Sequence, residues 1–174
     1  MRIVVSDTSC MIDLRKASLL EDFLRLPYSF VMPDILFEDE WLCISDNEKI
    51  ALQQRGLEVR ELSGASVTRA QRYFNEHNPL KLNDCFALAL AEDIEDSILL
   101  TGDGPLRDVS RGNGVEVRGV LWITDELEKH DIVPLPRLYD ALQLFHDDDL
   151  VFLPRNEIIR RLRRLAKLLG LGHG

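Results

Sequence analysis

Short apolar and β-branched runs alternate along the chain with longer segments in which apolar residues recur every three or four positions. The short runs predict strands at 2–6, 29–32, 57–62, 97–101 and 115–118. The longer segments predict helices at 9–24, 33–46, 47–55, 66–77, 82–93, 103–112, 119–129, 135–147 and 154–169. Because strands that alternate with helices build parallel sheets, the pattern predicts an α/β fold with a mainly parallel central sheet.

The C-terminal part of the chain has a different pattern, which is helical throughout. Prolines punctuate residues 134–154, and the last helix, 154–169, carries an apolar stripe with arginines opposite. We therefore expect one α/β domain over residues 1–130 and a helical extension over residues 131–174, packed on the same domain.

Composition describes a soluble globular protein. Apolar residues make up 45% of the 174 positions and charged residues 29%, so the chain can bury a core. Its uninterrupted apolar stretches fall well short of the roughly 18 residues that span a bilayer. The N-terminus lacks a basic-then-apolar leader, so we expect a cytoplasmic protein with no membrane partner.

Charge is unevenly distributed. The net charge is −9, but residues 151–174 carry six basic side chains and one acid, which gives +5 there and leaves −14 for residues 1–150. An acidic body repels nucleic acid unless divalent cations neutralise its cleft.

The three cysteines form no C-x-x-C pair and are expected to be reduced core thiols, so any metal here must be held by oxygen ligands.

Two aspartates directly follow predicted strands. Asp7 directly follows the run 2–6, and Asp103 follows the run 97–101 after one glycine. Because an open parallel sheet gathers ligands outside the carboxyl ends of its strands, these acids belong to one cleft and suggest a metal site. Asp103 could equally be the N-cap of the helix that follows it.

Two more acidic segments lie between them in the sequence. Glu38, Asp39 and Glu40 form a run on the helix predicted at 33–46, and Asp84 begins the helix 82–93, with Asn83 where an N-cap would stand. Each has a structural alternative, because the run could be a solvated helix face. Asp84 could simply complement the positive end of the helix dipole.

The order of these acids resembles the PIN-domain ribonuclease family and, within it, the VapC-like toxins. The resemblance rests on four stretches and covers residues 1 to about 118: IVVSDTS at 3–9, VMPDILFEDEW at 31–41, LNDCFALALA at 82–91 and LLTGDGPL at 99–106. It implies a three-layer α/β/α fold and a Mg²⁺- or Mn²⁺-dependent endoribonuclease that cuts RNA. It further implies the toxin of a type II toxin–antitoxin pair, with a cognate antitoxin as partner and a homodimer.

The resemblance also assigns roles to individual residues. The metal-ligand and catalytic positions fall on Asp7, Asp84 and Asp103, with Glu40 as the second acid and Asp39 and Glu38 as its competitors. The supporting polar positions are Thr8, Ser9, Asn83 and Thr101. The chemistry is consistent with these types, because Mg²⁺ and Mn²⁺ prefer carboxylate and water oxygens and use few protein ligands.

Two other functions compete with this one. A non-catalytic PIN-like interaction module would keep the acids only as helix caps. A haloacid-dehalogenase-like phosphatase would use Asp7 as nucleophile, but such enzymes need a second aspartate where this chain has Ser9.

The basic helix 154–169 has three interpretations. Its leucine stripe can pack on the body, its arginines can hold RNA phosphates, or its surface can dock an acidic partner. For RNA contact the candidate residues are Arg160, Arg161 and Arg164.

Overall fold

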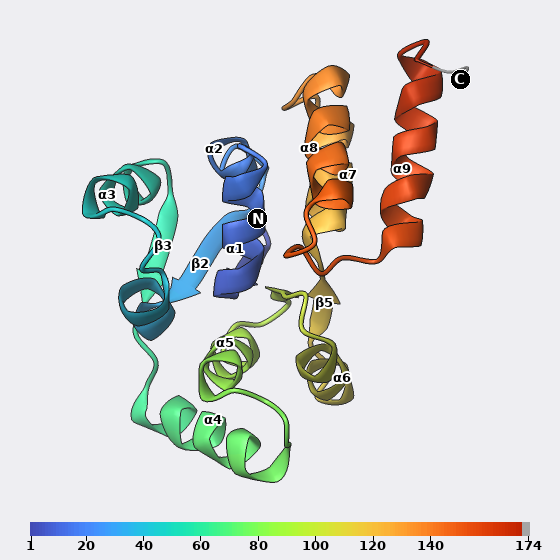
Figure 1. The fold of residues 1–174 in the computed structure, drawn as a ribbon. Helices are drawn as coiled ribbons and strands as arrows, with labels where there is room; N and C mark the ends of the chain where they lie inside the picture. Colours follow the sequence, from blue (N-terminus) through green and yellow to red (C-terminus); the bar gives the residue numbers. More distant parts are fainter. Residues whose placement is uncertain (172–174) are drawn as a thin grey trace. The chain divides into compact units, whose positions relative to one another are not determined.

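The central sheet has five strands, and all of them are parallel (Figure 1). The computed structural model describes residues 1–171, except for the side chain of Glu40. Strand order is β3-β2-β1-β4-β5, with helices flanking the sheet. The strands are β1 (Ile3–Ser6), β2 (Ser29–Pro33), β3 (Leu57–Arg60), β4 (Ile98–Leu100) and β5 (Glu116–Arg118). The predicted α/β class and the five predicted strands are confirmed, and the sheet is wholly rather than mainly parallel.

The helices follow the predicted order, with two departures. Their bounds are α1 (Thr8–Lys16), α2 (Leu20–Phe23), η1 (Leu36–Glu40), α3 (Asp46–Gln54), α4 (Gly64–Glu76), α5 (Leu82–Glu92), α6 (Gly104–Gly112), α7 (Val120–Lys129), α8 (Leu135–Asp147) and α9 (Arg155–Leu168). The continuous helix expected at 9–24 is wrong, because Ser18 has a φ of 56° and breaks it into α1 and α2.

The second departure is the helix expected at 33–46. Only the π-helical turn η1 forms there, and the chain leaves helical geometry at Trp41. A new helix, α3, starts after Ser45, whose side chain accepts a hydrogen bond from the Glu48 N–H while the Glu48 carboxylate accepts one from the Ser45 N–H. This capping box gives α3 its own beginning, so the two segments cannot merge into one helix.

Contacts within the chain define two compact units. Unit 1 comprises Met1–Met11 and Pro27–Gly119, which hold the sheet and α3 to α6. Unit 2 comprises Ile12–Leu26 and Val120–Gly174, which hold most of α1 together with α2, α7, α8 and α9. The expected domain division at residue 130 remains a prediction, because compact units record contacts and not parts that fold independently.

The core of unit 1 centres on β1 and α5. Val4 and Val5 of β1 are fully buried between β2 and β4. Residues 85–91 of α5 are all buried, and α5 contacts β1, β2 and β4. A helix that is apolar all round suits this position, because a sheet covers one side and α4 the other.

Unit 2 is a helical assembly fastened by ion pairs. Asp22 of α2 is 8% exposed and binds Arg137 of α8 at 2.8 Å. Helix α9 packs on α8 and buries Ile158 and Leu165. The apolar stripe predicted for this helix is thus used inside unit 2, as the packing interpretation expects.

Candidate metal centre

The strand order reverses between β1 and β4. From β1 the chain moves through β2 to β3 on one side, and then returns to add β4 and β5 on the other. Ligands of open parallel sheets bind outside the carboxyl ends of the strands where the order reverses. Asp7 directly follows β1, and Thr101 directly follows β4, so both lie at this reversal point.

Asp7 is held by hydrogen bonds from its own helix and from the neighbouring strand. Its Oδ1 accepts from the Ser9 hydroxyl and from the Cys10 N–H, both at 3.0 Å, so Asp7 caps the start of α1. The Thr101 hydroxyl also donates to the Asp7 carboxylate. The Asp7 backbone N–H donates to the Leu100 carbonyl at 3.0 Å, which fixes the residue against β4.

Burial sets the electrostatics of Asp7. The residue is 3% exposed, and within the described part of the chain no lysine, arginine or histidine forms an ion pair with it. Burial raises the pKa of its carboxyl group, although the hydrogen bonds from Thr101, Cys10 and Ser9 oppose that rise. Buried carboxylates are normally paired, and Asp7 has no cationic partner among the described residues, so a cation placed beside it would stabilise its ionised form.

Asp103 is linked to Asp7 through Thr101. The Asp103 N–H donates to Thr101 Oγ1 at 3.1 Å, and Thr101 is fully buried. Asp103 Oδ1 accepts from the Leu106 N–H at 2.8 Å, so this acid is the N-cap of α6, as its structural interpretation expected. Asp103 Oδ2 makes no hydrogen bond to any described residue and offers a ligand oxygen.

Asp84 points to the same edge of the sheet by topology. Helix α5 ends near the amino end of β4, where the Ala91 carbonyl accepts from the Ser97 hydroxyl at 2.7 Å. Its first turn, which carries Asp84, therefore lies toward the carboxyl edge. Burial, together with the nearby Asp84 charge, raises the pKa of the Cys85 thiol to about 11.

The expected N-cap role of Asn83 is wrong. Helix α5 begins at Leu82, with Lys81 as its N-cap residue and no side-chain cap, so Asn83 already lies in the first turn. The chain before the helix supplies no short polar side chain at the capping position, and the propensity of asparagine for caps was not decisive.

The run of acids after β2 lies in an irregular turn. Glu38 and Asp39 belong to η1 and are exposed, whereas the side chain of Glu40 lies outside the described residues. Trp41 follows, fully buried, and its indole N–H has no partner among the described residues. π-Helical turns are rare and often occur at functional sites.

Within the part of the chain that the structure describes, no three His, Cys, Asp or Glu side chains form a group that could hold a metal ion. The donor chemistry nevertheless fits a hard cation, because Mg²⁺ is usually bound by one or two carboxylates together with waters and substrate phosphate. Asp7 supplies a buried carboxyl group without a cationic partner among the described residues, and Asp103 supplies an oxygen without a hydrogen bond.

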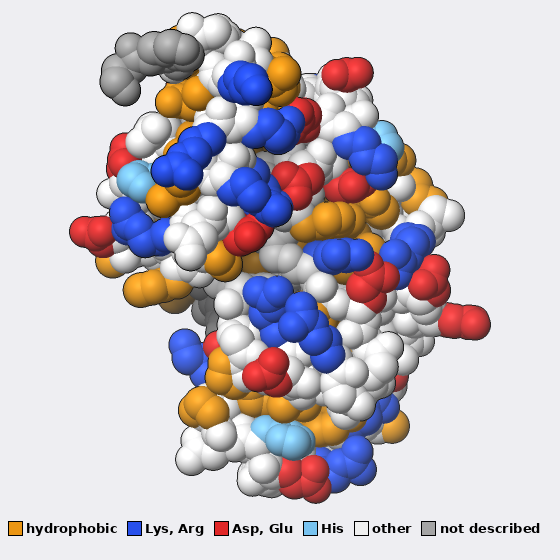
Figure 2. All heavy atoms as spheres, turned by 90° about the vertical axis from the view of Figure 1, so that its right-hand side faces the viewer, with side chains coloured by type: hydrophobic (Ala, Val, Ile, Leu, Met, Phe, Trp, Pro, Cys, Tyr) orange, Lys and Arg blue, Asp and Glu red, His pale blue; other side chains and the backbone are white. Residues whose placement is uncertain are grey.

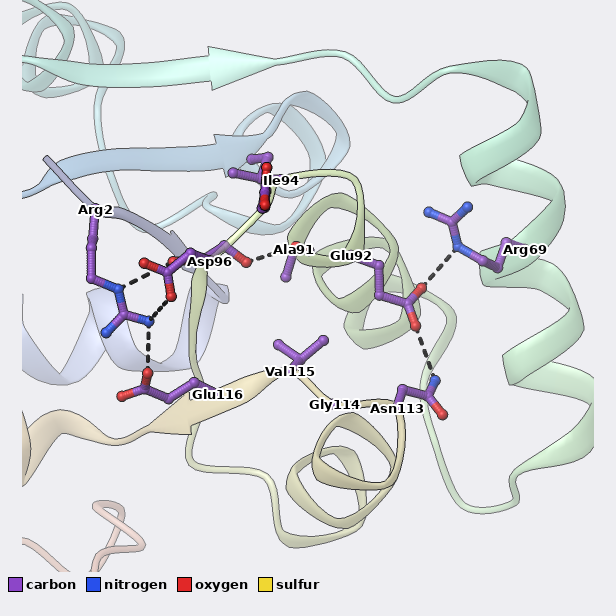
Figure 3. Close-up of a pocket in the computed structure, with 12 residues that line it drawn as sticks. Arg2, Arg69, Ala91, Glu92, Ile94, Asp96, Asn113, Gly114, Val115 and Glu116 are labelled. Atoms are coloured by element: carbon purple, nitrogen blue, oxygen red, sulfur yellow. Dashed lines mark hydrogen bonds and ion pairs between the residues drawn. The ribbon is translucent and has the colours of Figure 1, made fainter.

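A pocket of about 620 Å³ lies at the opposite, amino-terminal edge of the sheet (Figure 3). Arg2 Nη2 reaches Glu116 at 2.6 Å and Asp96 at 3.1 Å across it. On its other wall, Glu92 accepts from Arg69 Nε at 2.8 Å and from Asn113 Nδ2 at 3.0 Å. These charges pair with each other and tie the strands and α4 together, and the described candidate residues all lie outside the pocket.

Comparison with known proteins agrees with this architecture. A family model of the PIN domain matches residues 3–167. The chain belongs to the PIN-domain family. PIN domains are generally nucleases, so the family supports a hydrolase acting on nucleic acid and removes the ground for a haloacid-dehalogenase-like phosphatase. None of the curated proteins compared with the chain matches it.

The family match also corrects the extent of the resemblance. The expectation that it ends near residue 118 is wrong, because the match continues to residue 167 and includes α7, α8 and most of α9. Those helices carry only amphipathic spacing, which many folds share, whereas the first part carries acids at strand ends.

Sequence reasoning missed one contributor to the centre and misplaced another residue. Cys10 donates its backbone N–H to Asp7, and the spacing of three residues typical of an N-cap was the available signal. Cys10 and Cys85 are buried as expected, but Cys43 is exposed, so its assignment to the core was wrong.

The basic residues considered for RNA contact all lie on α9. Arg161 binds Asp125 through two hydrogen bonds at 2.8 and 2.6 Å, and Arg164 binds Glu128. Arg160 is exposed and pairs with Glu157 one turn earlier.

Throughout residues 1–171, every helix is too short or too polar to cross a membrane.

Proposed function

We propose that the protein is a Mg²⁺- or Mn²⁺-dependent endoribonuclease with its metal centre at the carboxyl ends of β1 and β4. The observation that carries the proposal is Asp7, a carboxylate that is 3% exposed, without a cationic partner among the described residues, at the reversal of strand order. A divalent cation is the counterion that such a residue lacks. The family of the chain supports nuclease chemistry at this place.

The chain's own residues would prepare this edge in two ways. Hydrogen bonds from Ser9, Cys10 and Thr101 fix the Asp7 carboxylate in one orientation. Helices α1 and α6 both start at the carboxyl edge, with Asp7 and Asp103 as their caps. The positive ends of their dipoles favour anionic groups there, including RNA phosphate.

We assign Asp7 and Asp103 as the principal metal ligands, with Asp84 and Glu40 as further ligands or as acceptors that orient water. Asp39 and Glu38 are the alternatives to Glu40, while Thr8, Ser9, Asn83 and Thr101 are supporting residues. When bound, the ion supplies Lewis acidity that activates water and neutralises charge developing on the phosphodiester. Thr101 would position both principal ligands, because its hydroxyl group contacts Asp7 and the backbone of Asp103.

Cleavage of a fluorescent single-stranded RNA in the presence of Mn²⁺ tests the proposal. The wild type should cut the RNA, and both a chelator and Asp7→Asn should abolish cutting. Asp108→Asn is the matched control, because Asp108 is an exposed aspartate of α6, and it should keep full activity. A folded wild type that leaves RNA intact with Mn²⁺ would instead support the non-catalytic interaction module.

The biological setting that we propose is a type II toxin–antitoxin pair, with a cognate antitoxin as inhibitor and with a homodimer as the assembly of the chain. The support is the resemblance to VapC-like toxins in the four acidic stretches. Expression of the wild type should arrest growth of a bacterial host, and Asp7→Asn should relieve the arrest. Arrest that persists with Asp7→Asn would separate toxicity from cleavage.

A further inference from the structure

Apart from Arg155, which begins the helix and lies 3.5 Å from His146 Nε2 of α8, the cationic side chains of α9 fall into two sets with different surroundings. One set is used inside unit 2: Arg161 has a side chain that is 13% exposed and forms a bidentate pair with Asp125 of α7. Arg164 likewise forms a bidentate pair with Glu128 of α7. The acidic partners raise the pKa of both guanidinium groups, so these arginines remain charged and hold α9 to α7 through ion pairs.

The second set faces solvent along one stripe of the helix. We call Arg160, Arg163 and Lys167 the outer stripe, because spacings of three and four residues place them on one face. All three are exposed, and Arg163 and Lys167 pair with no described residue. Arg160 meets only Glu157 of the same helix, and an exposed pair of this kind stabilises little and opens readily.

The chemistry of the stripe favours a polyanion over a protein partner. Asn156, four residues before Arg160, continues the same face and is also exposed, so the exposed side chains of this face are all polar or cationic. Protein interfaces usually need an apolar centre, whereas phosphate contacts need only cations and polar donors. From position 160 to position 167 the helix rises about 10 Å. A strand stacked as in a duplex presents one phosphate per about 3.4 Å of rise over that distance.

The charge of the whole chain makes this surface unusual. Residues 1–150 carry a net charge of −14, which opposes the approach of RNA, whereas residues 151–174 carry +5. Figure 2 looks at the side of the molecule that carries α9 and shows lysine and arginine side chains exposed there, with acidic ones interspersed. Arg161 and Arg164 are engaged by α7, and Arg155 lies next to His146, so the outer stripe holds the other three cations of α9.

We infer that the outer stripe of α9 binds the phosphate backbone of RNA, independently of base sequence, and that Arg161 and Arg164 hold the helix in place without contacting RNA. The inference rests on the proposed ribonuclease function for its choice of RNA. It assigns substrate affinity to a surface in unit 2, while the proposed chemistry belongs to unit 1.

The test compares two triple variants for RNA binding. The first is Arg160→Gln with Arg163→Gln and Lys167→Gln. The control removes the same charge from exposed arginines of unit 1, as Arg55→Gln with Arg72→Gln and Arg111→Gln. Fluorescence anisotropy with two single-stranded RNAs of unrelated sequence, in EDTA to prevent cleavage, gives the affinity over a salt series.

The expected result is a change in salt dependence. Three phosphate contacts contribute about −2 to the slope of log K against log salt, at about −0.7 each for a single strand. The outer-stripe variant should therefore lose a slope of about 2 and more than about tenfold in affinity at low salt, equally for both RNAs. The control variant should keep most of both quantities.

Three results would overturn the inference. One is an outer-stripe variant with wild-type slope and affinity, and another is a control variant that loses as much as the outer-stripe variant. The third is unchanged RNA binding with lost binding to polyglutamate, which would assign the stripe to an acidic protein.

Cleavage assays keep this inference separate from the proposed function. With Mn²⁺ and with enzyme in saturating excess over RNA, the outer-stripe variant should reach the wild-type single-turnover rate, because it retains Asp7 and Asp103. A wild type that binds RNA through the stripe but never cleaves would overturn the nuclease proposal alone. A wild type that cleaves while the stripe variant keeps full affinity would overturn the inference alone.

Discussion

Replacing Asp7 by Asn should stabilise the metal-free protein. Asparagine has nearly the same volume and keeps an oxygen that can accept the Cys10 N–H and the Ser9 hydroxyl, so the cap of α1 survives. What disappears is a buried negative charge. Because burial raises the pKa of the Asp7 carboxyl above its unfolded-state value, the folded protein loses stability as pH rises from the unfolded-state pKa through the folded-state pKa.

The size of the effect follows from opposing contributions. Moving a carboxylate from water into the protein interior destabilises the folded state by roughly several kcal/mol. Each hydrogen bond to the charged group stabilises it by about 1.5–3 kcal/mol. The raised pKa shows that the cost prevails, so we expect Asp7→Asn to add on the order of 1 kcal/mol to the free energy of unfolding in EDTA. For a chain of this size that is a rise of about 2–4 °C in Tm.

Divalent cation should reverse the order of the two proteins. A ligand at a concentration of about 100 times its Kd stabilises the folded state by about 2.7 kcal/mol, or about 5–11 °C in Tm. The wild type should show this shift with Mg²⁺ or Mn²⁺, and Asp7→Asn should lose most of it. Thermal unfolding followed by circular dichroism, with and without EDTA, measures both quantities, and Asp108→Asn serves as the exposed control.

Equal metal-induced shifts in the wild type and in Asp7→Asn would refute the reasoning, because the ion would then bind elsewhere. A lower Tm of Asp7→Asn in EDTA would refute the electrostatic part, since it would mean that the charged form stabilises the fold. The two outcomes are independent and separate the metal assignment from the burial argument.

Three further predictions concern single contacts. Asp103→Ala should lower the free energy of unfolding by about 0.5–2 kcal/mol through loss of the α6 cap, whereas Asp103→Asn should keep stability and lose cleavage, as urea denaturation and RNA assays would show. Arg161→Gln should lower the free energy of unfolding by about 2 kcal/mol without changing RNA affinity. A double-mutant cycle with Asp125→Asn should assign most of that loss to the interaction between the two side chains. Ser45→Ala should lower the free energy of unfolding by about 1 kcal/mol by removing the capping box of α3. Ser45→Thr keeps a capping hydroxyl, so an equal loss of stability in that variant would contradict this.

The sheet and its acidic edge could be predicted from sequence because their signals are local. Each strand is a short apolar run, and the chain turns polar where the strand ends, as at Asp7 after β1. The rule that ligands collect at the carboxyl ends of parallel strands then predicts Asp7 and Asp103 at one edge of the sheet. The signal for α5 is equally local, because its apolar residues predict a helix at 82–93.

Features that depend on distant partners could not be read in this way. The fastening role of Arg161 requires Asp125, which lies 36 residues earlier in the chain and on another helix. The π-helical turn before Trp41 and the break at Ser18 arise from packing that overrides helical periodicity. Sequence alone also could not tell which cations of α9 are engaged and which remain exposed.

The most direct test of the metal centre is a crystal structure of the protein soaked in Mn²⁺, with anomalous differences collected at the manganese edge. We predict a peak in contact with carboxylate oxygens of both Asp7 and Asp103, at about the 2.0–2.2 Å typical of small divalent ions. A peak at saturating Mn²⁺ that touches neither residue, with Asp7 still enclosed by its hydrogen-bond donors, would contradict the account.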